Sequence, residues 1–274
     1  FAKNNPVSLE VGAHHTMQLV TEPFNATDHR INWSSSNKSA ASVDENGTVT
    51  ALRPIESVDI TAVCKANPAL RCTWNFKITR TKGYITKQTL DNLDLTAIKN
   101  VMITAHPDDE TLWGGGHLLE GEYLVVCMTH GWNEKRRTAF EQTMRSTNDK
   151  YLILDYPDVR KTLACGKYET DLLSTCKNAM KEDIKQILTY KKWNIIATHN
   201  PSGEYGKFLH QQISKMVSES YNKNTDKSAV LYYFGRYYKP GNIPGPQLSP
   251  EILTIKKTLV NRYYPTAKGA IDAF

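Results

Sequence analysis

The sequence predicts two domains: an all-β sandwich, then an α/β domain with a doubly wound (Rossmann-like), largely parallel sheet. A length of 274 residues exceeds what one small core needs and suits two domains. Residues 7–79 contain short alternating segments with turn signals about every 8–12 residues, as sandwiches do. From Asn100 onwards, strand-like and helix-like segments alternate, as in parallel sheets. We therefore expect a sandwich at residues 1–80, a polar linker and lead-in at 81–97, and the α/β domain at 98–274.

The first 80 residues alternate apolar and polar side chains, as half-buried strands do. This alternation predicts strands at residues 7–11, 16–20, 31–34, 48–51, 58–63 and 74–78. Glu45-Asn46-Gly47 reads as a hairpin-type turn, because Asn and Gly accept the left-handed backbone that tight hairpins need. No helix is needed in this part of the chain.

The remainder of the chain alternates between two kinds of segment. Apolar runs at residues 101–105, 123–129, 151–154 and 193–198 predict buried strands. Helices are predicted at 112–120, 136–150 and 171–190, the last with Ile184, Ile187 and Leu188 on one face. In doubly wound sheets the functional site lies at the carboxyl ends of the strands. The loops that follow residues 105 and 198 are therefore the places to look for chemistry.

Charge and hydropathy narrow the class of protein. The 34 basic and 28 acidic residues give a net charge of +6, but they are spread along the chain. Nucleic-acid binders concentrate such charge on one stripe, so we expect a mixed solvated surface and no nucleic-acid partner, with an anionic cell-wall polymer or membrane surface as the alternative. No apolar run reaches the roughly 18 residues of a transmembrane segment. The chain begins at Phe1 without an initiator Met or signal sequence, which favours a mature or trimmed form.

The five cysteines are informative through their spacing. Two local pairs predict the disulfides Cys64–Cys72 and Cys165–Cys176, which form in an oxidising compartment. Cys127 lies inside an apolar run and is predicted to be a buried free thiol. These pairings predict a secreted or cell-surface protein. Five reduced cysteines in a cytosolic protein are the alternative.

The first chemically suggestive segment follows the strand predicted at residues 101–105. It reads His106-Pro107-Asp108-Asp109-Glu110, so an imidazole and two adjacent carboxylates emerge at a strand end, with Pro107 restricting the backbone between them. His and Asp are ordinary zinc ligands, and adjacent carboxylates rarely point the same way. One of them can bind a metal while its neighbour faces the attacking water. A plain loop with a capping Asp is the alternative.

The second segment, residues 198–210, follows the strand predicted at 193–198 and supplies the third ligand that the first segment lacks. Two glycines shape its loop, and His210 stands at the head of the next helix. Two His and one Asp around zinc leave a fourth position open, which is typical of catalytic rather than structural sites. In isolation, His210 would read as a helix-start residue.

Two stretches resemble known families. The run LEVGAHHTMQL, the block INWSSSNKSAASVDENGTVTA and the following SVDITAV resemble the bacterial Ig-like domain over nearly all of the first segment. That resemblance implies a sandwich that acts as a spacer or adhesive module. The motif AHPDDETLWGGG, followed about 90 residues later by HNPSGEYGKFLH, resembles the PIG-L/LmbE-like zinc-dependent N-acetylglucosaminyl deacetylases over roughly residues 98–274.

The second resemblance implies a role for each matching residue. His106, Asp109 and His210 would hold one divalent zinc ion, and Asp108 would be the general base. Tyr205 falls at the family's active-site tyrosine.

The resemblance also implies substrate contacts. An Arg shortly before a Glu contacts substrate in the family; Arg137 with Glu141 is the match, although Arg136 is open because the spacing is one residue longer. Glu204, beside the active-site tyrosine, is placed with the substrate-binding residues.

The sequence departs from the family at one catalytic position. The second motif of the family carries a His that is held to be cationic where this chain has Lys207. An unperturbed ammonium, with a pKa of about 10.4, is a poor proton donor at neutral pH. Lys207 is then either purely electrostatic, or its pKa is depressed, or the enzyme is slow. His199 and His130, each at a strand end, are fallback imidazoles.

Taken together, these observations predict a hydrolase that removes the acetyl group from N-acetylated amino sugars of an extracellular glycan or glycoconjugate. Zinc with Lys207 or Tyr205 would hold the oxyanion, and Asp108 would move the proton. Two alternatives stay open: a catalytically weak carbohydrate-binding protein on the same fold, and an amidase of a small N-acyl molecule. Residues 235–250, rich in Tyr, Gly and Pro, are predicted to be a surface loop, with a lid or sugar platform as the alternative.

Overall fold

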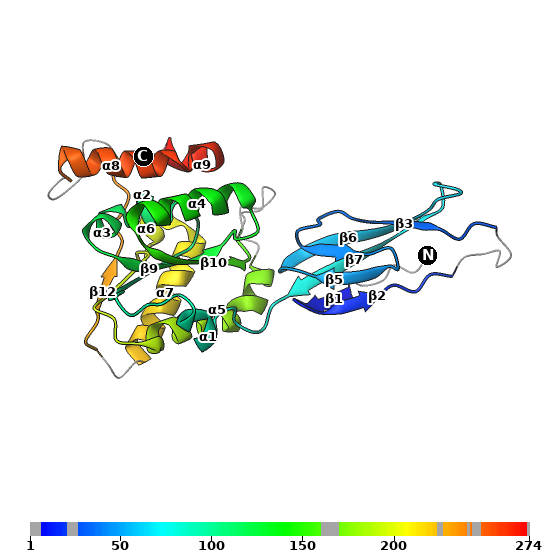
Figure 1. The fold of residues 1–274 in the computed structure, drawn as a ribbon, viewed down its shortest axis with the longest axis horizontal. Helices are drawn as coiled ribbons and strands as arrows, with labels where there is room; N and C mark the ends of the chain where they lie inside the picture. Colours follow the sequence, from blue (N-terminus) through cyan, green and yellow to red (C-terminus); the bar gives the residue numbers. More distant parts are fainter. Residues whose placement is uncertain are drawn as a thin grey trace. The chain divides into compact units, whose positions relative to one another are not determined.

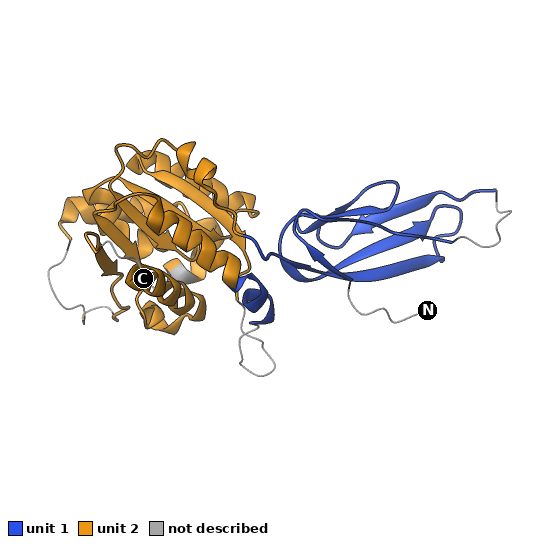
Figure 2. Cartoon of the chain, turned by 90° about the horizontal axis from the view of Figure 1, so that it is seen from below, with its two compact units in different colours: residues 1–82, 169–177 blue, residues 83–168, 178–274 orange. Residues whose placement is uncertain are grey.

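The computed structural model describes residues 7–20, 27–159, 170–223, 227–239, 242 and 248–272. The chain forms two compact units, coloured separately in Figure 2. The first comprises residues 1–82 with 169–177, and the second comprises 83–168 with 178–274. In the described part of the chain, every helix is too short or too polar to cross a bilayer.

The first unit is a β-sandwich, as predicted. One sheet has the order β1(Val7–Glu10), β7(Arg71–Thr79), β6(Ile55–Cys64), β3(Ile31–Ser35), and the other has β2(His14–Thr16), β5(Thr48–Ala51), β4(Ala41–Val43). Its core holds Val49, Ile60, Phe76 and Ile78, each fully buried. Gly47 has φ +77°, and a Cβ there would lie 2.5 Å from the Trp33 ring, so the hairpin needs glycine for both its backbone and its packing. The strand predicted at 16–20 is instead the shorter, earlier β2.

The predicted disulfide between Cys64 and Cys72 is wrong in this structure, where both side chains are free thiols. The reason is strand register: Cys72 on β7 lies opposite Ala62 of β6, so Cys64 is two residues further along. A diagonal pair of this kind separates the Cβ atoms well beyond the roughly 3.8 Å that a disulfide requires. Cys165 lies outside the described residues, and its predicted partner Cys176 is buried. Cys127 is buried, as predicted, with its Sγ directed at the Ala105 and Thr129 carbonyl oxygens.

The second unit contains the doubly wound sheet that the sequence predicts. All its pairings are parallel, and the strand order is β10(Lys150–Tyr156), β9(Tyr123–Thr129), β8(Asn100–Thr104), β11(Ile195–Thr198), β12(Val230–Tyr233). Figure 1 shows α4(Glu134–Thr147), α8(Pro250–Asn261) and α9(Tyr264–Ile271) on one face of this sheet and α7(Phe208–Lys223) on the other. The strand order reverses between β8 and β11, and that switch point is where open α/β sheets bind ligands.

Several helices differ from the sequence expectation. The helix predicted at 112–120 is split into α2(Asp109–Leu112) and α3(Gly115–Glu120). Gly114 at the break packs against Met102, where a Cβ would lie 2.7 Å from the methionine methyl group. The strand β12 and the helices α1(Lys87–Asp91), α8 and α9 were not predicted, whereas α5(Asp171–Tyr190) has the predicted bounds. The predicted loop at 235–250 falls partly outside the described residues; 235–239, 242 and 248–249 have no helix or strand, and Pro250 is the first residue of α8.

The segment predicted as linker and lead-in is tied to the second unit by a buried carboxylate. Asp183 on α5 is fully buried and accepts hydrogen bonds from the backbone N–H groups of Tyr84 and Ile85, at 2.9 and 2.7 Å. The hydroxyl of Tyr156 on β10 donates to the same carboxylate at 2.7 Å. A buried carboxylate is stable only when its oxygens are satisfied in this way. The chain is therefore fixed at Tyr84 and Ile85, directly before α1(Lys87–Asp91).

Candidate metal centre and active site

Both candidate segments meet at the carboxyl ends of the adjacent strands β8 and β11. Residues 105–109 leave β8, His199 follows β11, and His210 lies in the first turn of α7. The two strand ends are joined by hydrogen bonds: Thr198 donates to the Ile103 carbonyl at 2.9 Å, and the Ala105 N–H donates to His199 Nε2 at 2.9 Å. The sheet thereby places the two loops side by side.

Three predicted metal ligands point their donor atoms at one another. His106 Nδ1 lies 3.1 Å from His210 Nε2, and Asp109 Oδ2 lies 3.3 Å from the first and 3.4 Å from the second. Ligand atoms bonded to zinc at about 2.0–2.1 Å with tetrahedral angles stand about 3.3 Å apart. The three side chains are almost fully buried. Their spacing fits one zinc ion.

The protons of both imidazoles are held on the side away from this cluster. His210 Nδ1 lies 2.5 Å from Glu204 Oε2, and His106 Nε2 lies 3.0 Å from Asp158 Oδ1. A carboxylate only accepts, so each of these nitrogens carries the hydrogen. Once the second proton of His106 is displaced, the facing nitrogens present two lone pairs beside the Asp109 carboxylate. Such an arrangement of electron pairs calls for a cation, and carboxylates that orient metal-binding His residues in this way are usual.

The electrostatics of the metal ligands follow from burial and from the acids around them. Burial lowers the pKa of His210 to about 4, so this ring is neutral and ready to bind a metal. Burial also lowers the pKa of His106, but Asp158 and Asp109 outweigh it and raise the value to about 9. A metal entering the site would displace that proton, since metal binding and protonation compete for the same lone pair.

Asp108 points to a different partner from its neighbour Asp109. Its Oδ2 lies 3.2 Å from an Arg136 nitrogen, and its side chain is 6% exposed. Burial and the charge of Asp109 raise the pKa of Asp108 to about 7, against the opposing effect of Arg136. The buried Glu110 accepts hydrogen bonds from the backbone N–H of Asp108 at 3.0 Å and from the Tyr263 hydroxyl at 2.5 Å. These two bonds fix the turn that carries Asp108. A carboxylate held near the cluster with a pKa near neutrality suits a general base.

The two arginines proposed for substrate binding are not equivalent. Arg136 reaches Asp108, and its buried Nε has no hydrogen-bond partner among the described residues. Arg137 instead donates to the Gly131 carbonyl oxygen at 2.8 Å. Its Nε lies 3.9 Å from Glu141 Oε1, and its side chain is 40% exposed. Successive helix residues point about 100° apart, so only one of the two can face the cluster. The geometry favours Arg136, the second choice from sequence, over Arg137.

The residues from Gly203 to Lys207 form the opposite wall. Tyr205 is 52% exposed, and its ring lies 6.1 Å from that of His210 and stacks on Trp113 at 5.9 Å. Burial lowers the pKa of Lys207, but the acidic groups around it, Tyr205, Asp109, Asp158 and Asp108, outweigh burial and raise the value. Lys207 is then a positive charge in this structure, and the alternative that its pKa is depressed beside zinc stays a prediction.

Glu204 does not have the surroundings of a substrate-binding residue. Its carboxylate is fully buried and lies against the Nδ1 atoms of both His199 and His210. Its backbone is also unusual, with φ +56°. Asp108, at φ +137°, and His130, at φ +68°, share this feature, so three of the five non-glycine residues with positive φ in the described chain surround one cluster. Strain concentrated in this way is typical of functional sites.

The two fallback imidazoles differ in what they can do. His199 is fully buried, and its Nε2 accepts the Ala105 N–H, so neither solvent nor a substrate reaches it. His130 lies nearer the opening, with its ring 5.7 Å from that of His106. Burial together with the positive neighbours His106 and Arg136 lowers the pKa of His130 to about 3.

Sequence reasoning missed three residues of the site: Asp158, Glu110 and Tyr263. Glu110 was part of the first motif, but nothing in the sequence connects it with Tyr263, 153 residues away. Asp158 lies two residues after the carboxyl end of β10. Since sites in such sheets lie at the carboxyl ends of the strands, this position could have been predicted.

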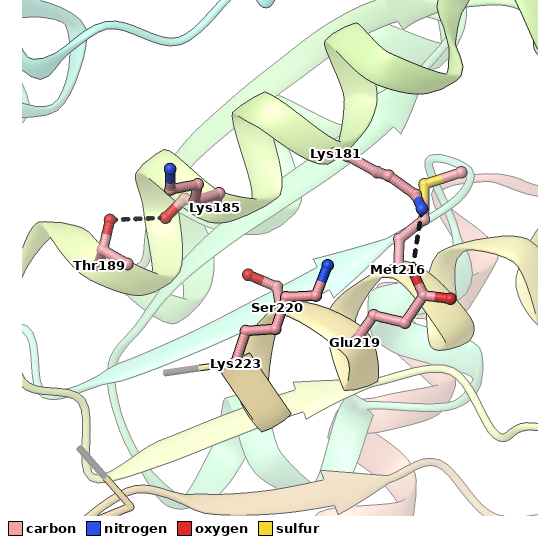
Figure 3. Close-up of a pocket in the computed structure, with 7 residues that line it drawn as sticks. All are labelled: Lys181, Lys185, Thr189, Met216, Glu219, Ser220 and Lys223. Atoms are coloured by element: carbon pink, nitrogen blue, oxygen red, sulfur yellow. Dashed lines mark hydrogen bonds and ion pairs between the residues drawn. The ribbon is translucent and has the colours of Figure 1, made fainter. Parts of the chain in front are cut away.

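The second unit also has a cavity that lies away from the strand-end cluster. It has a volume of about 390 Å³ and lies between α5 and α7, lined by Lys181, Lys185, Thr189, Met216, Glu219, Ser220 and Lys223. Figure 3 shows Lys181 directed at Glu219, 2.9 Å away. This hollow offers ammonium groups, of which one is neutralised, and no imidazole. The groups that could hold a metal ion lie in the strand-end cluster.

The first unit matches a known protein family. Residues 2–74 match the bacterial Ig-like domain (group 2), so the chain contains such a domain. Over 267 residues, or 87% of this chain, it is 37% identical to the uncharacterized protein CA_P0160 of Clostridium acetobutylicum. Over 147 residues it is 27% identical to the uncharacterized protein L374 of Acanthamoeba polyphaga mimivirus, 51% of this chain. The chain spans 28% and 64% of the lengths of these relatives.

Solved structures with low sequence identity are similar to part of this chain. One is a deacetylase in the biosynthesis pathway of teicoplanin, with a TM-score of 0.46, 15% identity, and coverage of 60% of this chain and 83% of that one. Another is GalB, a 4-carboxy-2-hydroxymuconate hydratase of Pseudomonas putida KT2440, with a TM-score of 0.41, 13% identity, and coverage of 62% and 85%. Since one fold serves many reactions, the chemistry of this chain must be argued from its own site.

Proposed function

We propose that this protein is a zinc-dependent hydrolase that removes the acetyl group from N-acetylated amino sugars. The observation that carries the proposal is the facing of two imidazole nitrogens and one carboxylate oxygen at zinc-ligand spacing, at the switch point of the sheet. His106, Asp109 and His210 would hold the ion. The PIG-L/LmbE-like sequence motifs that these residues belong to support the choice of substrate.

Each remaining group of the site has a place in amide hydrolysis. A zinc ion at the three ligands would lower the pKa of water and polarise the acyl carbonyl. Asp108, held by Arg136, takes the proton from the attacking water and later delivers it to the leaving amine. The charge of Lys207 and the hydroxyl of Tyr205 stabilise the oxyanion that forms in between. Glu204 keeps the His210 lone pair directed at the ion, in place of the substrate contact expected from sequence.

We further propose that the protein acts outside the cell or at its surface, on a glycan or glycoconjugate. Support comes from the bacterial Ig-like domain, a type of module that is often extracellular. The absence of a disulfide between Cys64 and Cys72 removes one of the sequence arguments for this location. The proposal rests on the domain and on the substrate class.

The proposed function is tested by measuring bound metal and acetate release on the same sample. We expect one zinc per chain, acetate release from chitotriose or peptidoglycan fragments, and loss of activity on treatment with a chelator, reversed by zinc. Zinc without acetate release from any glycan, together with sugar binding, would identify an inactive binding protein. Activity confined to small N-acyl compounds would identify an amidase of a different substrate class.

A second expectation concerns Glu204, whose carboxylate holds the His210 hydrogen. Replacing Glu204 with Gln keeps the size but substitutes a weaker acceptor that can also flip, so zinc affinity should fall about 10–100-fold. Chelator competition measures that affinity. Glu219→Gln, at a surface ion pair on α7, is the matched control and should leave it unchanged. An unaltered zinc affinity in Glu204→Gln would return this residue to a role in substrate binding.

A further inference from the structure

The loop after β9 presents an aromatic ring beside the cluster that the proposed mechanism does not use. Trp132 is 38% exposed, which is unusual for so large an apolar side chain in a position next to a buried site. Its ring stacks on that of His130 at 6.3 Å with an interplanar angle of 24°, and the His130 ring lies 5.7 Å from that of His106. The indole is therefore two ring contacts away from a proposed metal ligand.

The loop is held rigidly in that position. The backbone N–H of Trp132 donates to the Asp155 carboxylate at 2.5 Å, and the backbone N–H of Gly131 donates to the Leu154 carbonyl oxygen at 3.0 Å. Both residues are therefore bound to β10. Arg137 adds a hydrogen bond to the Gly131 carbonyl. A ring carried by a loop whose backbone is fixed in this way loses less conformational entropy on binding a ligand than a ring on a mobile loop.

A second aromatic surface stands on the other side of the cluster. Tyr205, beside His210, is more than half exposed and is backed by Trp113. The Trp132 ring is connected to His106 through the ring of His130, and the Tyr205 ring lies beside that of His210. Polar groups suited to hydroxyl groups contact the cluster, notably the Asp158 carboxylate, 27% exposed and 3.0 Å from His106, and the Arg136 guanidinium, 3.2 Å from Asp108.

We propose that Trp132 is a stacking platform for a second sugar ring, so that the site takes an oligosaccharide in preference to a single amino sugar. This inference rests on the proposed function, because it places the reacting sugar at the metal cluster. The C–H face of a pyranose ring is apolar and flat, and an exposed indole is the side chain best able to cover it. Trp132 is two ring contacts from His106, so we place it beside the next sugar of the oligosaccharide and not beside the sugar that reacts.

The test compares binding and turnover in the zinc-loaded full chain. Titration of chitotriose and of N-acetylglucosamine into the Asp108→Asn protein gives the Kd of each sugar while hydrolysis is slow. Adding Trp132→Ala should raise the Kd of chitotriose about tenfold and leave that of the monosaccharide within about twofold, because an aromatic contact of this kind is worth about that factor. Trp132→Phe should recover most of the loss. In the active protein, Trp132→Ala should raise KM for chitotriose with little change in kcat.

The control is Tyr264→Ala, which removes an equally exposed ring, 39%, whose face is covered by Lys268 of its own helix α9. Equal Kd values for chitotriose in the Trp132→Ala and parent proteins would overturn the platform, whether or not acetate is released. Loss of zinc in Trp132→Ala would also overturn it, by showing a structural role. Binding of chitotriose that depends on Trp132, without acetate release by the active protein, would retain the platform and reject the deacetylase. A parent protein that binds no sugar rejects the platform as well.

Discussion

The Asp108→Asn protein is expected to release acetate about 10²–10⁴-fold more slowly than the parent while it keeps one zinc per chain. Asn has the size of Asp and still accepts the hydrogen bond from Arg136, so the turn between β8 and α2 is preserved. What it loses is the ability to take a proton from the attacking water. The surroundings of Asp108 indicate that this ability is finely set, because burial and Asp109 raise its pKa while Arg136 lowers it.

The matched control is Asp109→Asn, one residue along the same turn. Asp109 Oδ2 faces the imidazoles of His106 and His210, so this change should remove zinc along with activity. Loss of zinc from Asp108→Asn would show that Asp108 is itself a ligand. Activity close to that of the parent would reject the mechanism and make His130 the candidate base, since His199 is fully buried and engaged by the Ala105 N–H.

The sheet and the meeting of the two motifs were predictable because both depend on periodicity and chain order. Alternating strands and helices imply parallel strands, and parallel strands carry their carboxyl ends to one edge. Residues in the loops that follow two such strands, and in the first turn of the helix after each loop, can therefore share that edge. This is why His106, Asp109 and His210, chosen from sequence, lie together in the structure.

The finer assignments depend on side-chain direction, which the sequence did not specify. Arg136 and Arg137 are neighbours on α4, and which one faces Asp108 is decided by the rotation of the helix, set at its start by the Asn133 cap. Glu204 turns inwards because its backbone adopts φ +56°, a conformation that a sequence does not predict for glutamate. The Cys64–Cys72 pairing failed for a related reason, since a shift of two residues in strand register separates thiols that are close in sequence.

A second possible metal-binding group shares His210 with the first and consists of His199, Glu204 and His210. In this group Glu204 Oε2 lies 2.5 Å from His210 Nδ1 and 3.2 Å from His199 Nδ1. The shorter distance is that of a strong hydrogen bond and is well below the roughly 3.3 Å between two ligands of one zinc ion. We therefore expect protons, and no metal, between these three side chains.

The two groups are separated by changing the His residue that each does not share. His106→Gln should weaken zinc binding on the order of 10²-fold or more and abolish acetate release, because one of three ligands is lost. His199→Gln keeps an acceptor for the Ala105 N–H, so zinc content should stay at one per chain even if the affinity falls through the loss of support for Glu204. His210→Ala should lose zinc in either case. Zinc retained in His106→Gln and lost in His199→Gln would move the metal to the second group and leave the facing lone pairs of His106 and His210 without the role assigned to them.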